Sequence, residues 1–296
     1  MKVANINSHQ TIPSSELILR PDGSLYHLGV LPEHIAPRII IVGDPERVPL
    51  ISALFEIIEF KVESREFVVH TGIYKDKRIT VVSSGIGVDN IDIVLNELDA
   101  AVNVDLNSRT PKAQLTSLEI VRIGTSGSIQ TDIPVGSFVA STAAFGLDGV
   151  PYTYGAQLET DEDIIVTALR SEIEQLRNHS GLYAARANRE LVDRIAFDMV
   201  QGITATQNGF YGPQGRTVRL HSVVEPILSR YASVEIDGQR VTNFEMECSG
   251  IYALSSMLGH KALTVCAILA NRASKEFHKD PSKSIETLIS TVLERF

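Results

Sequence analysis

At residues 38–47 the chain reads RIIIVGDPER, an apolar run followed directly by residues that start helices. The run at 38–42 is typical of a buried strand. Asp44 is a favourable N-cap and Pro45 suits the first helical position, which predicts a helix body over residues 48–58. A buried strand that leads straight into a helix is the building unit of an α/β fold.

The same alternation continues on both sides of this segment. Strand-like runs lie at residues 67–74, 78–83, 118–123, 137–142, 199–206 and 263–270. Helical apolar spacing marks residues 90–102, 161–176, 222–231, 248–258 and 282–296. Because the two patterns interleave from end to end, we predict a single α/β domain over residues 1–296 with a central mixed β-sheet. Residues 1–20 are expected to be a loosely ordered lead-in.

The composition excludes several classes of protein. The chain has 296 residues, 44% of them hydrophobic, which is incompatible with a disordered protein. The longest apolar run has about eight residues, too short to cross a bilayer, and no signal peptide is evident, so no membrane partner is expected. A net charge of -9 disfavours nucleic acid as a partner. Two cysteines without a CxxC motif indicate a reducing compartment, and we expect a cytoplasmic protein.

Two segments combine glycine with arginine where a strand is expected to end. Gly43 and Arg47 lie at the predicted start of a helix, whose free N–H groups favour an anion. Arg122 and Thr125 lie in RIGTSG, which we interpret as a glycine turn after the strand 118–123. Either segment alone is explained by a capped helix or a local ion pair. Together they favour a small oxyanion, since neither is a Walker A loop or a dinucleotide fingerprint.

Two later segments suit a sugar and a planar base. In NFEMEC (243–248), Glu245 or Glu247 could hold a vicinal diol, with Met246 packed on the sugar; a solvated acidic turn is the alternative. In QNGFYGPQGR (207–216), Gln214 and Arg216 could read an imide edge beside an aromatic ring. A mobile surface loop is the alternative for this segment.

Taken in order, these segments resemble the nucleoside phosphorylases of the uridine phosphorylase type. The resemblance covers roughly residues 26–272 and rests on the motifs YHLG (26–29), GDPER (43–47), REF (65–67), SGIG (84–87), RIGT (122–125), FYGPQGR (210–216), EME (245–247) and NR (271–272). It implies a distorted β-barrel flanked by α-helices. The activity that it implies is cleavage of uridine by inorganic phosphate, a co-substrate, with no other cofactor.

The resemblance also implies a role for each matching residue. Phosphate would be bound by Gly43, Arg47, Arg65, Arg122 and Thr125. Ribose would be bound by His27, Met246 and Glu247, and the base by Phe210, Gln214, Arg216 and Arg272. The residues implied to be catalytic are Arg47, Arg122, Glu247 and Arg216. Since His27 and Arg65 would come from a neighbouring subunit, the minimal unit implied is a dimer, which in bacterial relatives assembles into a hexamer.

Several alternatives remain beside this reading. Purine-cleaving relatives use an Asp near the position of Asn271, and its absence favours pyrimidine nucleosides. A nucleosidase, a phosphorylase for a purine or deoxy-pyrimidine nucleoside, and a non-catalytic nucleoside-binding protein are the other hypotheses. No metal site is expected, because the eight histidines form no metal-binding spacing. Asn90 stands where the relatives' monovalent-cation site carries Ser, so no cation is assigned. The segments 103–116 and 178–198 are longer than the bacterial pattern and could alter packing between subunits. This argues against the hexamer more than against the dimer.

Overall fold

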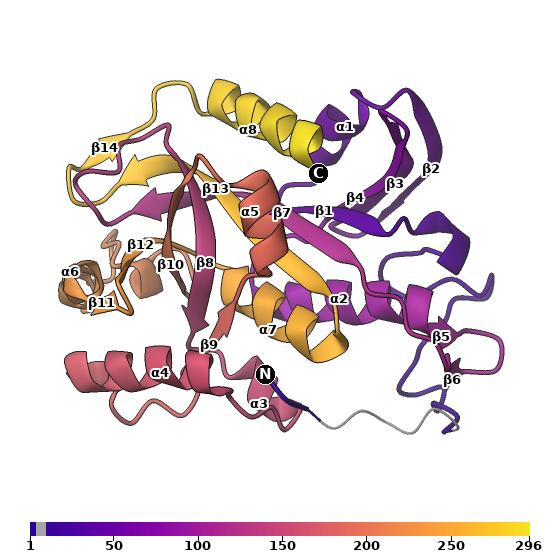
Figure 1. The fold of residues 1–296 in the computed structure, drawn as a ribbon, viewed down its shortest axis with the longest axis horizontal. Coiled ribbons are helices and arrows are strands. Elements are labelled where there is room, and N and C mark those ends of the chain that lie inside the picture. Colours follow the sequence, from indigo (N-terminus) through magenta and orange to yellow (C-terminus); the bar gives the residue numbers. More distant parts are fainter. Residues whose placement is uncertain (4–9) are drawn as a thin grey trace.

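The computed structural model describes residues 1–3 and 10–296 (Figure 1). Residues 4–9, part of the predicted lead-in, lie outside the described residues. The strands in the described part are β1 (Arg38–Val42), β2 (Ile57–Ser64), β3 (Phe67–Tyr74), β4 (Lys77–Ser83), β5 (Val104–Asp105), β6 (Thr110–Pro111), β7 (Glu119–Ser128), β8 (Phe138–Gly146), β9 (Tyr183–Arg186), β10 (Val200–Thr206), β11 (Glu235–Ile236), β12 (Gln239–Glu245), β13 (Lys261–Asn271) and β14 (Glu276–Phe277). The α-helices are α1 (Arg47–Ser52), α2 (Val88–Asn103), α3 (Val150–Thr153), α4 (Thr160–Glu172), α5 (Arg189–Ile195), α6 (Glu225–Ser233), α7 (Cys248–Leu258) and α8 (Pro281–Arg295).

Five strands at the centre of the sheet close into a barrel. They pair in the order β12, β10, β8, β13 and β7, and β12 pairs back to β7. The β13–β8 and β12–β7 pairs are antiparallel, whereas β10–β12, β10–β8 and β13–β7 are parallel. The predicted mixed sheet with a distorted barrel is therefore confirmed.

Beyond β7 the sheet continues through β1, β4, β3 and β2. Strand β1 lies between β4 and β7 and is parallel to both, so that Ile41 is level with Arg122 and Val42 with Ser83. This register brings the chain that follows β1 next to the middle of β7. Two segments separated by about eighty residues of sequence thus meet at one place.

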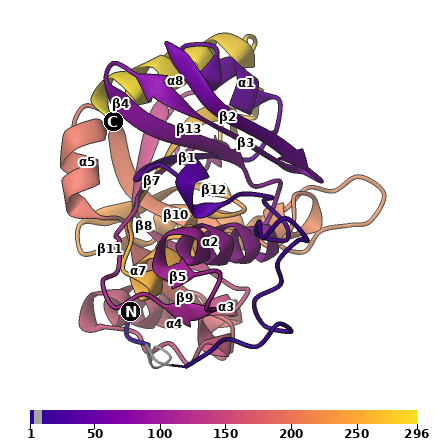
Figure 2. The ribbon, with the colours of Figure 1, turned by 90° about the vertical axis from the view of Figure 1, so that its right-hand side faces the viewer.

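Helices cover the sheet on two sides (Figures 1 and 2). Side chains of β1 alternate between the two cores: Ile39 packs in the core that includes residues of α2 and α7, and Ile40 in the core that includes residues of α1, α5 and α8. A third core joins α4 and α6 to the barrel strands β8, β10 and β12. The alternation follows from the two-residue period of a strand buried on both faces.

The helix predicted over residues 48–58 is wrong beyond Ser52. Helix α1 ends there, and β2 begins at Ile57 and pairs antiparallel with β3. Strand β2 is the edge of the sheet, and over residues 58–63 its apolar and charged residues alternate with the two-residue period of a strand, a signal that the predicted helix missed. Asp44 is also not the N-cap, which is Glu46; the Asp44 carboxylate accepts the Glu46 N–H in the turn before the helix.

The glycine turn predicted after residue 123 is also wrong. Strand β7 runs without interruption to Ser128, and Gly124 and Gly127 lie inside it. A Cβ on Gly127 would lie 3.0 Å from the Phe244 ring, and one on Gly124 would lie 2.7 Å from the Arg122 guanidinium carbon. These glycines make room for neighbouring side chains inside the barrel rather than turning the chain.

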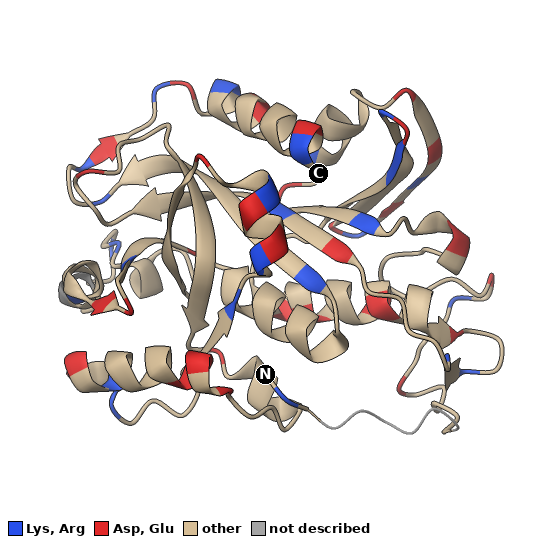
Figure 3. Ribbon diagram, viewed as in Figure 1, with Lys and Arg blue, Asp and Glu red and all other residues tan. Residues whose placement is uncertain are grey.

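The other predicted elements are present with shifted ends. The helix predicted over 161–176 is divided into α4 and a short 3₁₀ turn, and the one predicted over 222–231 is α6. Strands β8 and β10 carry no charged residue, and the coloured positions in Figure 3 lie mostly on helices and outer segments. Among the described residues no helix is long and apolar enough to span a membrane.

Candidate active site

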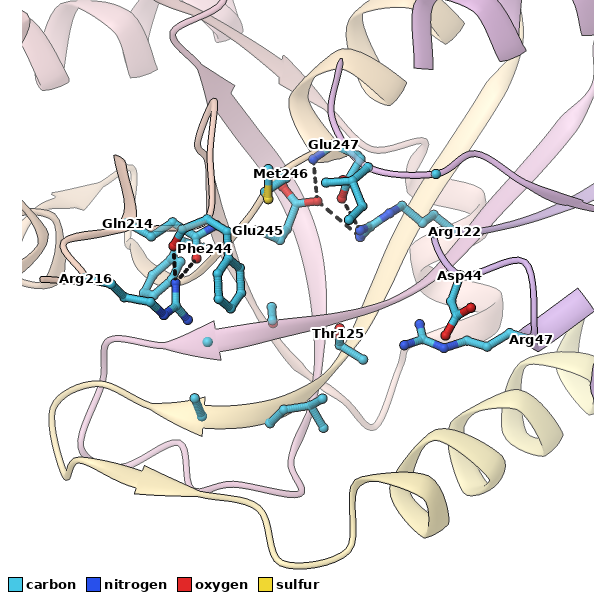
Figure 4. Close-up of a pocket in the computed structure, with 18 of the residues that line it drawn as sticks. Asp44, Arg47, Arg122, Thr125, Gln214, Arg216, Phe244, Glu245, Met246 and Glu247 are labelled. Carbon is cyan, nitrogen blue, oxygen red and sulfur yellow. Dashed lines mark hydrogen bonds and ion pairs between the residues drawn. The ribbon is translucent and has the colours of Figure 1, made fainter. Parts of the chain in front are cut away.

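A cavity of about 620 Å³ lies where the ends of β1, β12 and β13 approach the middle of β7 (Figure 4). Most of the predicted site residues line it: Gly43, Arg47, Arg122, Thr125, Phe210, Gln214, Arg216, Met246 and Glu247. Figure 4 shows Arg47 at one end, Arg216 at the other, and Glu247 and Met246 between them. His27, Arg65 and Arg272 are not among the residues that line it.

The end of the cavity near Arg47 is suited to an anion. Arg47 is half-buried, and within the described residues no hydrogen bond engages its guanidinium. Burial lowers the pKa of Arg47, the Asp44 carboxylate opposes that shift, and the nearby charge of Arg122 adds to it. A bound anion would compensate this cationic charge.

Arg122 is buried below the same end of the cavity. Its guanidinium forms ion pairs with Glu247 and, at 3.1 Å, with Glu245, and it lies 3.4 Å from the Cys266 sulfur. Burial opposes its charge, but the two carboxylates outweigh burial and raise the pKa of Arg122. Its buried Nε has no hydrogen-bond partner among the described residues. Thr125, which follows along β7, adds a partly exposed hydroxyl to this end.

The carboxylates of Glu245 and Glu247 both pair with Arg122, but their other hydrogen-bond partners differ. The Glu245 carboxylate accepts hydrogen bonds from the Thr206 hydroxyl at 2.8 Å, the Glu247 N–H at 2.8 Å and the Cys248 N–H at 2.9 Å. It thereby joins the end of β12 to the start of α7, and its acceptor capacity is used within the protein. Glu245 is therefore a structural residue and not the diol ligand.

Glu247 keeps acceptor capacity for a ligand. Its Oε1 accepts the Gly87 N–H at 2.8 Å and its Oε2 pairs with Arg122, which leaves further lone pairs on both oxygens. Burial raises the pKa of Glu247 to about 7; the charge of Arg122 opposes that shift and the charge of Glu245 adds to it. One guanidinium faces two buried carboxylates, so the cluster carries excess negative charge.

The opposite end of the cavity is formed by the segment between β10 and α6. Arg216 lies with its guanidinium carbon 3.8 Å from the centre of the Phe210 ring, and its Nη1 donates to the Gln214 side-chain oxygen at 2.5 Å. Burial, reinforced by the charge of Arg272, lowers the pKa of Arg216. The aromatic face, the carboxamide and the guanidinium thus lie together, as predicted for a planar ligand with a polar edge (Figure 4).

Arg272 supports this segment from outside the cavity. Its Nη1 donates to the carbonyl oxygen of Gln214 at 2.8 Å and its Nη2 to that of Gly215 at 3.3 Å. Arg272 thus lies behind Gln214 and Gly215, and its place beside a base stays a prediction.

Asn271 is committed to the protein. Its side-chain Nδ2 donates to the carbonyls of Gln130 and Ile133 at 2.8 and 2.9 Å, and its Oδ1 accepts the N–H groups of Ala273 and Ser274, both at 2.9 Å. All hydrogen-bonding groups of its amide are therefore used.

His27 and Arg65 lie together on another part of the protomer. Arg65 is at the tip of the β2–β3 hairpin, with its guanidinium carbon 5.6 Å from the centre of the Tyr26 ring. Tyr26 and Arg65 are exposed, and the His27 side chain is 27% exposed. This location is consistent with the expectation that both residues serve the cavity of a neighbouring subunit.

Sequence reasoning missed several apolar residues that line the cavity, of which the large ones are Ile86, Phe244, Leu269 and Phe277. Phe244 precedes the predicted EME segment, and its ring packs against Gly127. Phe277 reaches the cavity because β14 folds back on β13. An apolar residue has no local signal that distinguishes a cavity wall from a core, so only the tertiary structure could identify these four.

Among the described residues, no group of three or more His, Cys, Asp or Glu side chains could hold a metal ion. Glu66 and Asn90 both lie next to Gly85, where an added Cβ would be 3.2 Å from Glu66 Cγ and 2.5 Å from Asn90 Nδ2.

The chain is similar to known nucleoside phosphorylases. The curated uridine phosphorylase of Thermococcus kodakarensis is 31% identical over 281 residues, which cover 95% of this chain and 90% of that protein. A curated purine nucleoside phosphorylase of Buchnera aphidicola is 26% identical over 86% of this chain and 91% of its own length. A Trypanosoma brucei nucleoside phosphorylase, whose crystal structure is described as showing uridine phosphorylase activity, has a TM-score of 0.84 and 29% identity, with 94% of this chain and 98% of that chain covered.

The sequence model of one family extends over most of the elements described above. It begins before β1 and includes the cavity and helix α8, matching residues 37–296. Together with the identity to the Thermococcus protein, this match establishes that the chain belongs to the phosphorylase superfamily.

Proposed function

We propose that this protein catalyses the reversible phosphorolysis of uridine to uracil and ribose 1-phosphate. One observation carries the proposal: a single cavity has guanidinium groups at one end, a carboxylate with free acceptor capacity in the middle, and an aromatic–amide–guanidinium group at the other. These three parts match a phosphate, a ribose and a pyrimidine in order. The Thermococcus relative and the Trypanosoma structure, whose names specify uridine phosphorylase or its activity, support the same substrate.

The chemistry requires three things of these residues. Cleavage of the bond between the anomeric carbon and the base nitrogen passes through an oxocarbenium-like state. Arg47 and Arg122 would hold phosphate below that carbon, which makes the attack effectively intramolecular. Glu247 would bind the ribose hydroxyls and place negative charge near the developing cation.

The leaving base becomes negatively charged as the bond breaks. Arg216 and Gln214 would stabilise that charge with a charge-assisted and a neutral hydrogen bond, while the Phe210 ring packs on the base. A purine would instead need a proton on its ring nitrogen. Asn271 has no proton to give, and its amide is bound to the protein on both sides. These features support a pyrimidine over a purine.

We further propose that the active unit is at least a dimer in which His27 and Arg65 complete the cavity of the partner. Their location outside their own protomer's cavity supports this assembly. Residues 1–296 would act as one domain, in the cytoplasm, with phosphate as co-substrate and without a metal or other cofactor. Because Glu247 would bind the 2′-hydroxyl, a modest preference for uridine over deoxyuridine and thymidine is expected.

The test is ultraviolet detection of uracil release from uridine, with and without inorganic phosphate, and with inosine in parallel. Phosphate-dependent cleavage of uridine supports the proposal. Cleavage of inosine instead would assign the protein to purine nucleosides. Cleavage without phosphate would make it a nucleosidase, and no cleavage of either would leave a nucleoside-binding protein.

A further inference from the structure

Glu97, on helix α2, makes an unusual number of contacts with one short segment of chain. Its two carboxylate oxygens accept the backbone N–H of His27 at 2.9 and 3.1 Å, and its Oε2 accepts that of Leu28 at 2.8 Å. The same carboxylate lies 2.7 Å from the ring Nδ1 of His27. The Glu97 side chain is only 13% exposed, so this arrangement is built into the protomer.

The opposite side of His27 is held as well. Arg20 donates to the His27 carbonyl at 3.1 Å and to the Ser64 hydroxyl at 2.5 Å, and Ser64 in turn donates to the same carbonyl at 2.5 Å. These bonds tie the segment to the β2–β3 hairpin, and Figure 2 shows the early part of the chain passing between that hairpin and α2. Gly29 has a φ of +65°, and a Cβ there would lie 2.4 Å from Arg20 Nη1, so glycine is needed for this packing.

These contacts determine the tautomer of the neutral His27 ring. A carboxylate accepts hydrogen bonds only, so the ring nitrogen that faces Glu97 must carry the hydrogen. In the neutral ring, Nε2 is then the acceptor. Within the described part of the chain Nε2 has no hydrogen-bond partner, and the ring is partly exposed beside Tyr26. The protein thus presents a bare acceptor nitrogen, fixed in direction, at its surface.

We propose that Glu97 is a positioning residue for the proposed reaction: it fixes the ring and the tautomer of His27 so that Nε2 accepts the 5′-hydroxyl hydrogen of the nucleoside in the partner's cavity. This inference rests on the proposed function, because it assumes that His27 reaches the ribose of a neighbouring subunit. Glu97 touches no substrate itself. Its effect is confined to the 5′-hydroxyl contact.

The variant Glu97→Gln isolates this effect. An amide of the same shape has one acceptor oxygen. With that oxygen on the Leu28 N–H, its NH₂ faces the ring, so that Nδ1 becomes the acceptor and Nε2 carries the hydrogen; with the oxygen on the ring, the NH₂ faces the Leu28 N–H and the segment loses that hydrogen bond. The measurement is kcat/KM for uridine and for 5′-deoxyuridine, which lacks the hydroxyl. We expect the value for uridine to fall about 3- to 10-fold and that for 5′-deoxyuridine to stay within about twofold, since one hydrogen bond is lost.

Two further variants complete the test. Asp99→Asn is the matched control, because Asp99 lies on the same helix, 3.3 Å from the buried ring of His260 and away from His27. In this variant the ratio of kcat/KM for uridine to kcat/KM for 5′-deoxyuridine should not change. In His27→Ala the ratio should fall as in Glu97→Gln, and adding Glu97→Gln to His27→Ala should cause no further loss on uridine.

The outcomes separate the inference from the proposed function. Equal losses of kcat/KM on both substrates in Glu97→Gln would show a merely structural role and overturn the inference. An unchanged kcat/KM for both substrates would overturn it as well. If the wild-type protein cleaves another nucleoside and not uridine, the proposed function fails, and the same variants are compared on that nucleoside and its 5′-deoxy form.

Discussion

At the scale of single residues, Glu245 and Glu247 differ in what their oxygens already bind. Glu245 is saturated by Thr206 and the start of α7, whereas Glu247 keeps lone pairs that open to the cavity. Two carboxylates separated by one residue therefore have different functions. Hydrogen bonds from distant parts of the chain, and not the local sequence, create the difference.

The first prediction concerns Glu247→Gln. The variant keeps the shape of the side chain but removes the negative charge next to the developing cation. We expect kcat for uridine to fall by about 10²-fold or more, which is the typical loss for a preorganised charge-stabilising group. Steady-state kinetics measure it, with the exposed Glu190→Gln as the control. An unchanged kcat would exclude Glu247 from the site.

The second prediction uses the raised pKa of Glu247. In the folded protein its carboxyl holds a proton up to about pH 7, whereas in the unfolded chain it releases it near its ordinary value of 4.5. Between these values the native state binds more protons, so the contribution of this group to the free energy of unfolding decreases as the pH rises. Urea denaturation from pH 4.5 to 7.5 should show a decrease on the order of 1–3 kcal/mol relative to Glu247→Gln. Parallel curves for the two proteins would contradict it.

The third prediction concerns Asn271→Asp. A carboxylate cannot donate to the carbonyls of Gln130 and Ile133, so two buried hydrogen bonds are lost. We expect a loss of roughly 2 kcal/mol or more in stability and no gain of inosine cleavage. Thermal denaturation and an inosine assay measure these effects. The exposed Asn178→Asp is the matched control, and efficient inosine cleavage by Asn271→Asp would refute the prediction.

At the scale of secondary-structure elements, the segment between β10 and α6 depends on the end of β13. Arg272 bonds the carbonyls of Gln214 and Gly215 and thereby joins the two elements. The residues that would read the base are thus held by a residue that need not touch the base. The conformation of the segment between β10 and α6 therefore depends on both hydrogen bonds from Arg272.

The fourth prediction tests this connection with Arg272→Ala. Loss of the two hydrogen bonds should loosen Gln214 and Arg216 and raise KM for uridine about 10-fold, because each bond contributes about 0.5–1.5 kcal/mol. KM for phosphate should stay unchanged, since Arg47 and Arg122 lie at the other end of the cavity. Arg240→Ala, which removes only an exposed ion pair with Asp132, is the control. An equal rise in both KM values would indicate general unfolding instead.

At the scale of the whole molecule, the residues of the proposed site lie in two regions of the surface. The cavity holds Arg47 and Glu247, while Arg65 and His27 lie on the β2–β3 hairpin and the segment beside it. A cyclic pair of subunits would bring each hairpin to the cavity of the other, and a symmetric dimer would then contain two complete sites.

The fifth prediction is recovery of activity by mixing. Arg65→Ala and Glu247→Gln should each be nearly inactive as pure proteins. When the two chains are co-expressed, half of the dimers are hybrids with one intact site, which gives roughly a quarter of wild-type activity. Uridine cleavage by the co-expressed, unfractionated mixture measures it. No recovery would place both residues in the site of the same chain.

The sequence by itself determined the fold class and the chemistry of the cavity. Strand and helix periods, glycine–arginine pairs and the segment of Gln214 and Arg216 are local patterns, and they predicted the α/β fold and most of the cavity-lining polar residues. The resemblance to a family added the order of the subsites. At β2 the strand alternation was present but was not recognised, whereas at β7 the local glycines suggested a turn and only pairing with β13 keeps the strand unbroken.

Only the tertiary structure decided which polar side chains are bonded within the protein and which remain free for a ligand. It assigned Glu245 to the joint between β12 and α7, Asn271 to the carbonyls of Gln130 and Ile133, and Arg272 to the support of Gln214. It also revealed Glu97, which no motif marks. The physical reason is that a polar side chain acts through the hydrogen bonds it has left, and the number left depends on partners far away in the sequence.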